Sequence, residues 1–179
     1  MLFNSLKFLI FFPIVTLVYF LIPQRVKYLW LLCASYYFYM CWNPEYAILI
    51  AVSTVITWLS GIFIEKGKTP LSRKLTVAAS FTINLAILFY FKYFYFTMDN
   101  INAIRAALHL SALTPKFDVI LPVGISFYTF QALSYTVDVY RHDVEPEKNL
   151  LKYALFVSFF PQLVAGPIER SKNLLSQVN

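Results

Sequence analysis

The chain has 179 residues, of which 59% are hydrophobic and only 13% are charged, and its mean hydropathy is +0.63. A soluble domain carries about 25% charged residues because it must cover a wide surface with polar groups, so this composition excludes a soluble globular domain. The net charge of +6 comes from short basic clusters between apolar runs. Such clusters are typical of topological charges and lipid contacts, not of a nucleic-acid-binding patch. We expect an integral membrane protein with the lipid bilayer as a partner.

Four apolar segments come before residue 100. They cover residues 6–22, 27–42, 45–64 and 75–96. A transmembrane helix needs about 20 residues, and a helix satisfies every backbone amide of a single segment inside hydrocarbon. No small-residue cleavage site follows the first segment, so we expect it to be retained as a span and not removed as a signal peptide. The sequence therefore predicts about four transmembrane helices in residues 1–96.

Basic residues in the connections predict the orientation of these helices. Arg25 and Lys27 follow the first segment, whereas the connection near Pro44 has no Lys or Arg. The third segment is followed by Lys66, Lys68, Arg73 and Lys74. Basic connections stay in the cytoplasm. We therefore expect an extracytoplasmic N-terminus in a multi-pass protein of the inner (plasma) membrane.

Residues 97–116 are predicted to form an extracytoplasmic segment at the membrane interface. Within it, residues 99–113 are predicted to form a short helix, in which Ile101, Ile104 and Leu108 suggest one apolar face. His109 is expected at the rim of this helix and not in a catalytic site.

The fifth apolar stretch, residues 117–140, is unlike the first four. Pro122 and Gly124 interrupt it near its start. Polar residues then punctuate it: Ser126, Thr129, Gln131, Ser134, Thr136 and Asp138. A helix facing lipid would not carry so many polar groups, so this one either faces protein on most sides or lines a wet cavity.

A sixth stretch, residues 150–165, is broken by Pro161 and followed by Gly166 and Pro167. Half-helices of this kind often mark binding sites in membrane proteins. The expected fold is all-α, a polytopic transmembrane bundle of about six membrane-embedded helical segments, some of them interrupted. Residues 117–179 are expected to begin a core that follows the spans of residues 1–96 and the interfacial segment of residues 97–116.

Two charged residues each allow two interpretations. Lys92 either snorkels to the outer interface among aromatic neighbours, which we favour, or carries a charge inside the bundle. Asp138 lies three residues before Arg141, so on a helix the two share a face. They form either a structural ion pair or, for Asp138, a polar group at the mouth of a cavity.

The densest polar cluster lies near the end of the chain. It consists of Gln162, Gly166, Pro167, Glu169 and Arg170. Gly166 permits close backbone approach, and Pro167 stiffens the next turn. The cluster is either a buried turn with a satisfied charge pair or part of the wall of a substrate tunnel.

No catalytic motif of the nucleophile-elbow, P-loop, HExxH or dinucleotide-binding type is present. His142 stands in a polar stretch and is expected to be solvated. Cys33 and Cys41 are separated by a spacing that suits neither a zinc site nor a redox pair. We expect no metal and no bound cofactor.

Three motifs carry a resemblance to a known family. They are residues 121–131 (LPVGISFYTFQ) with Tyr135, Asp138, Tyr140 and Arg141 after them, residues 159–170 (FFPQLVAGPIER), and residues 36–39 (YYFY) before 42–44 (WNP). Together they resemble the membrane-bound O-acyltransferase (MBOAT) family, in its bacterial branch of alginate O-acetyltransferases. The resemblance covers nearly the whole chain.

This resemblance implies transfer of an acetyl (acyl) group from a cytoplasmic thioester, acetyl-CoA in this branch, to a hydroxyl of an extracytoplasmic polysaccharide such as alginate. Family members have a central tunnel with a histidine that acts as general base, and the resemblance also implies extracytoplasmic acetylation partner proteins. The candidate tunnel-lining residues here are Gln131, Asp138, Gln162, Gly166, Pro167, Glu169 and Arg170. The family histidine is expected downstream of Asn179, so this chain resembles an N-terminal fragment without a catalytic residue, inactive alone.

Two other functions stay open on the sequence. Interrupted helices with polar residues also suit a component of a transporter or channel, although repeat symmetry and a midplane ion site are lacking. The aromatic-rich first hundred residues would also suffice for a non-catalytic membrane scaffold.

Overall fold

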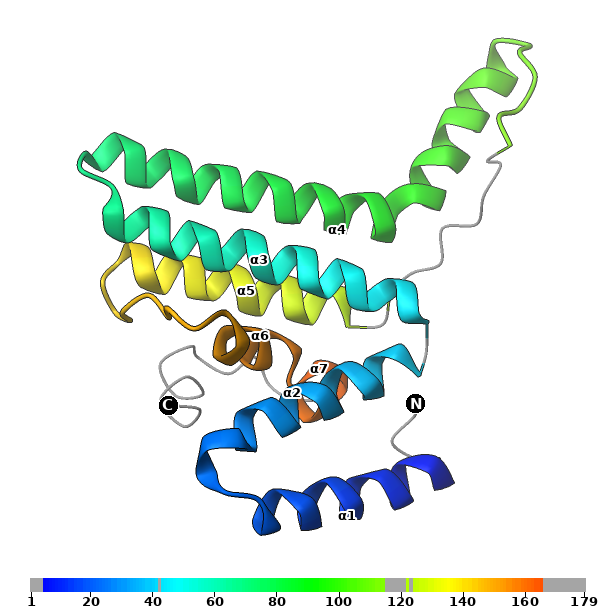
Figure 1. Cartoon of the computed structure of the whole chain (residues 1–179). Helices are drawn as coiled ribbons and strands as arrows, with labels where there is room; N and C mark the ends of the chain where they lie inside the picture. Colours follow the sequence, from blue (N-terminus) through cyan, green and yellow to red (C-terminus); the bar gives the residue numbers. More distant parts are fainter. Residues whose placement is uncertain (1–4, 42, 115–121, 123, 166–179) are drawn as a thin grey trace.

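The structure is a computed structural model, which describes residues 5–41, 43–114, 122 and 124–165 (Figure 1). The described residues form helices and no strand, which confirms the predicted all-α class. The helices are α1 (Leu6–Leu21), α2 (Gln24–Met40), α3 (Pro44–Lys66), α4 (Pro70–Ala107), α5 (Ile125–Tyr140), α6 (Leu150–Ser158) and α7 (Phe160–Ala165). Among the described residues, α3 and α4 are long and apolar enough to cross a membrane, and α1 is apolar but shorter. The count of six membrane-embedded segments stays a prediction.

Polar capping residues stand at the N-termini of several of these helices. Asn43 caps α3 by accepting a hydrogen bond from the backbone N–H of Glu45, and Thr69 caps α4 in the same way through Ser72. A proline follows each cap at the first helical position, where its missing N–H breaks no helical bond. The prolines that end the predicted apolar segments therefore also start the next helices.

Helix α3 lies at the centre of the molecule. It packs against α2, α4, α5 and α6, while α5 also packs against α4 and α6. Helix α1 packs against α2 and forms one edge of the bundle, and α4 forms the opposite edge (Figure 1). The core therefore sits where α3, α5 and α6 meet, and residues of all three helices share one buried cluster.

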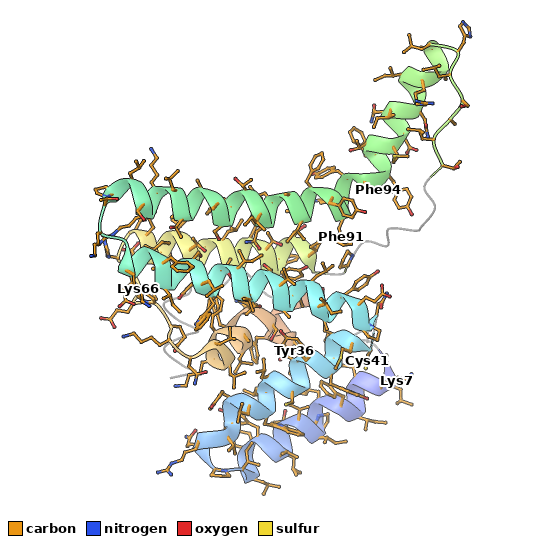
Figure 2. The ribbon with its side chains drawn as sticks, turned by 45° about the horizontal axis from the view of Figure 1, so that its top comes forward. Lys7, Tyr36, Cys41, Lys66, Phe91 and Phe94 are labelled. Atoms are coloured by element: carbon orange, nitrogen blue, oxygen red, sulfur yellow. The ribbon has the colours of Figure 1, made fainter. Side chains whose placement is uncertain are left out.

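Helix α4 is longer than the sequence predicts. We expected a span that ends at residue 96 and a separate short helix from residue 99, but the structure has one helix of 38 residues. No proline or glycine stands between residues 71 and 107, so nothing in the sequence ends the helix there. The helix bends near Phe94, and its last turns leave the bundle (Figures 1 and 2). Close to the bend, the Asn100 side chain donates to the carbonyl of Phe96 (2.7 Å).

Large apolar side chains are exposed on two helices, while polar residues are buried. Many large apolar side chains of α1 and α4 are exposed, among them Leu6, Leu9, Phe20, Leu75, Ile83 and Phe89. The buried residues of α4 are Ser80, Asn84 and Leu88. Apolar faces of this extent mark contact with a membrane or another protein, and they are consistent with a membrane protein.

The basic connections gather at one end of the bundle. The Arg73 guanidinium, at the start of α4, lies 3.3 Å from the His142 ring after α5, and the Lys152 ammonium of α6 lies over the Tyr28 ring of α2. Figure 2 shows Lys66 at this end and Lys7 and Cys41 at the other. Which end faces the cytoplasm stays a prediction.

Candidate functional site

The candidate site is built around a break between two helices. Helix α6 ends at Ser158 and α7 begins at Phe160, with Phe159 between them in a non-helical conformation (φ −56°, ψ 110°). Pro161 lies in the first turn of α7, where a proline is tolerated. The break predicted at Pro161 is therefore present and falls two residues earlier.

Two side chains from other helices satisfy the backbone groups that the break frees. In a continuous helix the N–H of Phe160 would donate to the carbonyl of Phe156. Here the Phe160 N–H donates to Ser35 Oγ (3.3 Å), and the Phe156 carbonyl accepts from Gln131 Nε2 (2.8 Å). Ser35 is fully buried on α2, and Gln131 is 4% exposed on α5. Since unsatisfied backbone groups are costly in a buried apolar environment, these two side chains stabilise the broken conformation.

The structure also brings together two of the predicted site residues. Gln131 Nε2 donates a second hydrogen bond to Gln162 Oε1 (3.2 Å), and Gln162 is buried on α7. Helices α5 and α7 therefore meet through paired carboxamides directly at the break.

Of the other predicted site residues, the structure describes only Asp138. Asp138 is half-buried two helical turns further along α5, and its backbone carbonyl accepts from the N–H of Asp143 (2.9 Å). The pairing of Asp138 with Arg141 stays a prediction. Gly166, Pro167, Glu169 and Arg170 lie outside the described residues.

A layer of buried hydroxyl groups joins α3, α5 and α6. The Tyr153 hydroxyl of α6 donates to Thr57 Oγ1 of α3 (2.8 Å), and Ser60 and Thr136 lie 3.3 Å apart between α3 and α5. The rings of Tyr135 and Tyr153 are in contact, with centroids 4.5 Å apart. These bonds tie α3, α5 and α6 into one polar core.

Gly61 permits the close approach of α3 and α5 in this layer. A Cβ atom at this position would lie 2.7 Å from the Tyr135 hydroxyl and 3.0 Å from its ring. Tyr135 is fully buried, and its hydroxyl accepts from the backbone N–H of Glu147 (3.0 Å). A larger residue at position 61 would therefore displace a tyrosine that is fixed on two sides.

The Tyr128 hydroxyl, three residues before Gln131 on α5, is buried without a hydrogen-bond partner among the described residues. Leaving such a group unsatisfied costs about 1–3 kcal/mol. A water molecule or a polar atom of a substrate that reached this hydroxyl would therefore be stabilised.

An apolar cavity of about 400 Å³ lies on the other side of the break, between α1, α2 and α6. Its walls include Val15, Leu31, Leu155 and Phe160. The volume lies in the range of small-molecule pockets, about 300–1,000 Å³. The broken helix thus separates a polar core from an apolar cavity.

Sequence reasoning missed Ser35, Thr57 and Tyr153. Thr57 could have been found from the sequence, because the buried polar and small residues of α3 recur at helical spacing. They are Ser53, Thr57, Ser60 and Gly61. Ser35 could not have been found in this way, since its partner Phe160 lies 125 positions away in the sequence.

The two histidines terminate helices. His109 (φ 55°) and His142 (φ 63°) are both in the left-handed conformation that usually follows a helix end. The His109 N–H donates to Ala106 and the His142 N–H to Val139, as expected for such caps. They therefore lie at the ends of α4 and α5, not at the break between α6 and α7.

Three other residues singled out in the sequence lie on the outside of the bundle. Lys92 is exposed, with its ammonium 5.6 Å from the centre of the Tyr93 ring, which agrees with the snorkelling interpretation. Cys33 and Cys41 are free and exposed. Within the described part of the chain, no three His, Cys, Asp or Glu side chains gather as a metal site would require.

Comparison with known proteins finds relatives along the whole chain. It is 40% identical over 183 residues to a probable alginate O-acetylase of Pseudomonas putida and 38% identical over 181 residues to one of Pseudomonas aeruginosa. Both matches cover 100% of this chain, but only 37% and 35% of the relatives. A peptidoglycan O-acetyltransferase of Helicobacter pylori is 31% identical over 207 residues, with 99% of this chain and 38% of the relative covered.

The chain therefore spans a little over a third of the length of these relatives. No protein-family model matches it, and no solved structure matches it. The sequence similarity nevertheless confirms the resemblance that the motifs indicated: this chain belongs to the alginate O-acetylase branch of the membrane-bound O-acyltransferase family.

Proposed function

We propose that this chain is part of a membrane O-acetyltransferase. The enzyme moves an acetyl group from a cytoplasmic thioester donor, acetyl-CoA, to a hydroxyl of an extracytoplasmic polysaccharide such as alginate. Relatives named alginate O-acetylase and peptidoglycan O-acetyltransferase support this reaction class. The observation that carries the proposal is the broken helix, whose freed backbone groups are held by Ser35 and Gln131. On the same helix as Gln131, the buried Tyr128 hydroxyl has no hydrogen-bond partner among the described residues.

The chain supplies part of the wall of the passage through which donor and acceptor meet. Gln131 and Gln162 form this wall at the break, and Asp138, Gly166, Pro167, Glu169 and Arg170 continue it. The general base is a histidine in the part of the relatives that this chain does not cover, which makes the chain inactive by itself. The acceptor hydroxyl loses its proton to that base and forms an ester bond with the acetyl group. The thioester bond breaks in the same reaction, and coenzyme A leaves as a thiolate that takes up a proton.

The proposed setting is the inner membrane, crossed several times, with the N-terminus outside the cytoplasm. The exposed apolar faces of α1, α3 and α4 support contact with lipid acyl chains. Partner proteins for acetylation lie on the outer side, where the polysaccharide acceptor is modified.

The end of α4 is proposed to lie along the outer membrane interface. Asn102 bonds the backbone of Leu113 through both its side-chain atoms (3.0 and 2.7 Å), and Arg105 Nε donates to the carbonyl of Ser111 (2.8 Å). The residues after the helix therefore fold back on its polar face. Ile104 and Leu108 stay more than 60% exposed and are free to enter the headgroup region.

The test uses the whole protein in membrane vesicles, with labelled acetyl-CoA and alginate. Gln131→Leu and Gln162→Leu are expected to lower the transfer rate about tenfold or more. The first removes the donor to the Phe156 carbonyl, and the second removes the carboxamide that pairs with this donor. Ser134→Ala, a half-buried polar change on the same helix, serves as the matched control and is expected to keep the rate within about twofold. Membrane insertion of each variant is measured in parallel.

Two outcomes would contradict the proposal. If both glutamine variants transferred acetyl groups at the wild-type rate, the helix break would have no role in the reaction. Solute flux through liposomes without an acyl donor, together with no transfer by the whole protein, would favour a transporter.

A further inference from the structure

A second cavity, of about 360 Å³, lies at the basic end of the bundle, away from the helix break. Its described lining comes from the α3–α4 connection and from the end of α5: Lys68, Thr69, Pro70, Arg73, Tyr140 and His142. These residues supply a guanidinium, an ammonium, an imidazole and two hydroxyl groups, and none of them carries a carboxylate. A pocket with this lining suits an anion.

The guanidinium of this pocket is held in place by its surroundings. Arg73 Nε donates to the carbonyl of Gly67 (2.9 Å), and Arg73 Nη1 lies 3.3 Å from His142 Nε2. Gly67 is buried, and a Cβ atom there would lie only 2.8 Å from Arg73 Cγ, so the packing of the arginine stem depends on a glycine. A preorganised guanidinium loses little freedom on binding an oxyanion, in contrast to a mobile surface lysine.

The start of α4 adds to the positive potential of the pocket. Thr69 and Pro70 are the cap and the first residue of this 38-residue helix, and both line the cavity. The N-terminus of a helix carries a partial positive charge that favours a nearby anion. The fixed arginine, the lysine and the helix terminus therefore act on the same space.

We propose that this pocket binds a phosphate group of a ligand at the membrane surface. The planar guanidinium of Arg73 can donate two parallel hydrogen bonds to phosphate oxygens. The ammonium of Lys68 suits a group with more than one negative oxygen. The pocket lies at the level where α3 ends and α4 begins, next to the basic connections that meet lipid headgroups. The phosphate comes either from an anionic lipid headgroup or from a soluble phosphate ester such as coenzyme A. This inference does not depend on acetyl transfer.

The test uses the purified chain in nanodiscs of phosphatidylcholine, without any acetyl-transfer assay. In the lipid arm, phosphatidylglycerol is added and the lipid retained by the protein is counted by native mass spectrometry. In the soluble arm, coenzyme A is titrated by calorimetry. Arg73→Gln and Lys68→Gln are each expected to lower the affinity for the bound ligand about tenfold or more, since each removes a charged hydrogen-bond donor.

Lys74→Gln provides the matched control, because Lys74 is exposed, directly follows Arg73, and does not line the pocket. It is expected to change the affinity by less than about twofold. If Arg73→Gln fails to fold, Lys68→Gln and His142→Asn take its place. Asn tolerates the left-handed backbone of His142, and both variants leave the contact of Arg73 with Gly67 intact.

Retention of phosphatidylglycerol alone would identify a headgroup site, and binding of coenzyme A alone would identify a site for a soluble phosphate ester. No binding in either arm would overturn the inference. Equal weakening by Lys74→Gln and by the pocket variants would also overturn it, because the attraction would then belong to the whole basic end.

Discussion

Helices α4 and α5 lie side by side on α3 but differ in how much of each helix is buried. Of the 38 residues of α4 only Ser80, Asn84 and Leu88 are buried, whereas α5 buries nine of its 16 residues. In α4 many large apolar side chains point outward, and two of the three buried residues are polar. In α5 polar residues such as Thr129, Gln131 and Thr136 are as buried as the apolar ones. Polar residues are therefore buried in both helices, and the exposed face of α4 is largely apolar.

This pattern is the reverse of that of a water-soluble helix, which turns its apolar stripe inward. In a bilayer a leucine gains nothing by leaving lipid, so packing and hydrogen bonds hold the helices together. The pair formed by Ser53 and Asn84 illustrates the rule: Ser53 Oγ donates to Asn84 Oδ1 (2.6 Å), and Asn84 Nδ2 donates to the carbonyl of Ser80 (2.9 Å). Substitutions on the outward and inward faces test this contrast.

The largest effect is expected for a charge on the outward face of α4. Ile83→Arg is expected to raise the free energy of insertion by about 2.5–3.5 kcal/mol, because Ile83 is exposed near the middle of the apolar part of the helix. Leu71→Arg, at the start of the same helix, is expected to cost less than about 1 kcal/mol, since its side chain can reach the surface. A glycosylation-based insertion assay measures both. Equal costs at the two positions would contradict a lipid-facing α4.

The next effect concerns the close contact of α3 with α5. Gly61→Ala is expected to destabilise the fold by about 1–3 kcal/mol, because the new methyl group meets the Tyr135 hydroxyl. Removing this hydroxyl with Tyr135→Phe is expected to recover part of the loss. A double-mutant cycle on the unfolding free energy in mixed detergent measures the coupling. Strictly additive losses would show that the two residues do not meet.

A smaller effect is expected at the helix break. Ser35→Ala removes the acceptor of the Phe160 N–H and is expected to destabilise the fold by about 1–2 kcal/mol. Ser158→Ala is the matched control, because its hydroxyl donates within its own helix, to the carbonyl of Ala154 (2.7 Å). It is expected to cost less than about 0.5 kcal/mol. Thermal unfolding in detergent compares the two, and a larger loss for Ser158→Ala would contradict the bonding described at the break.

The smallest effect is expected in the hydroxyl layer. Tyr153→Phe removes the bond to Thr57 and is expected to cost about 0.6 kcal/mol, the average of interhelical hydrogen bonds measured in a membrane protein. Thr57 keeps a partner in the carbonyl of Ser53 (2.8 Å), which limits the loss. The same unfolding assay applies, and a loss above about 2 kcal/mol would mean that Tyr153 does more than this single bond.

The starts of the helices could be predicted from the sequence because their signals are local. Asn43 with Pro44 and Thr69 with Pro70 are cap and proline pairs within two residues. Local signals also explain why the structure has one helix where two were predicted. No proline or glycine separates the predicted span from the predicted interfacial helix in α4. A change of composition at residue 97 indicated a boundary that the backbone does not have.

The candidate site could be predicted only in part, because its contacts are distant in the sequence. Gln131 and Gln162 stood out as polar residues in apolar stretches, and the structure joins them. Their roles at the break, and that of Ser35, depend on how α2, α5 and α6 pack, which spacing along one helix does not determine. The position of the break itself followed from Pro161 to within two residues.

The outward apolar face of α4 is tested most directly by measuring what surrounds it. In the purified chain with Cys33 and Cys41 changed to serine, a spin label is attached through Ile83→Cys or through Lys68→Cys, and the protein is placed in liposomes. Collision rates with oxygen, which concentrates in lipid, and with a water-soluble nickel complex are then compared. The label at position 83 is predicted to meet oxygen and to be shielded from nickel, with the reverse at position 68. A label at position 83 that meets the nickel complex as readily as the one at position 68 would place α4 in water and contradict the account.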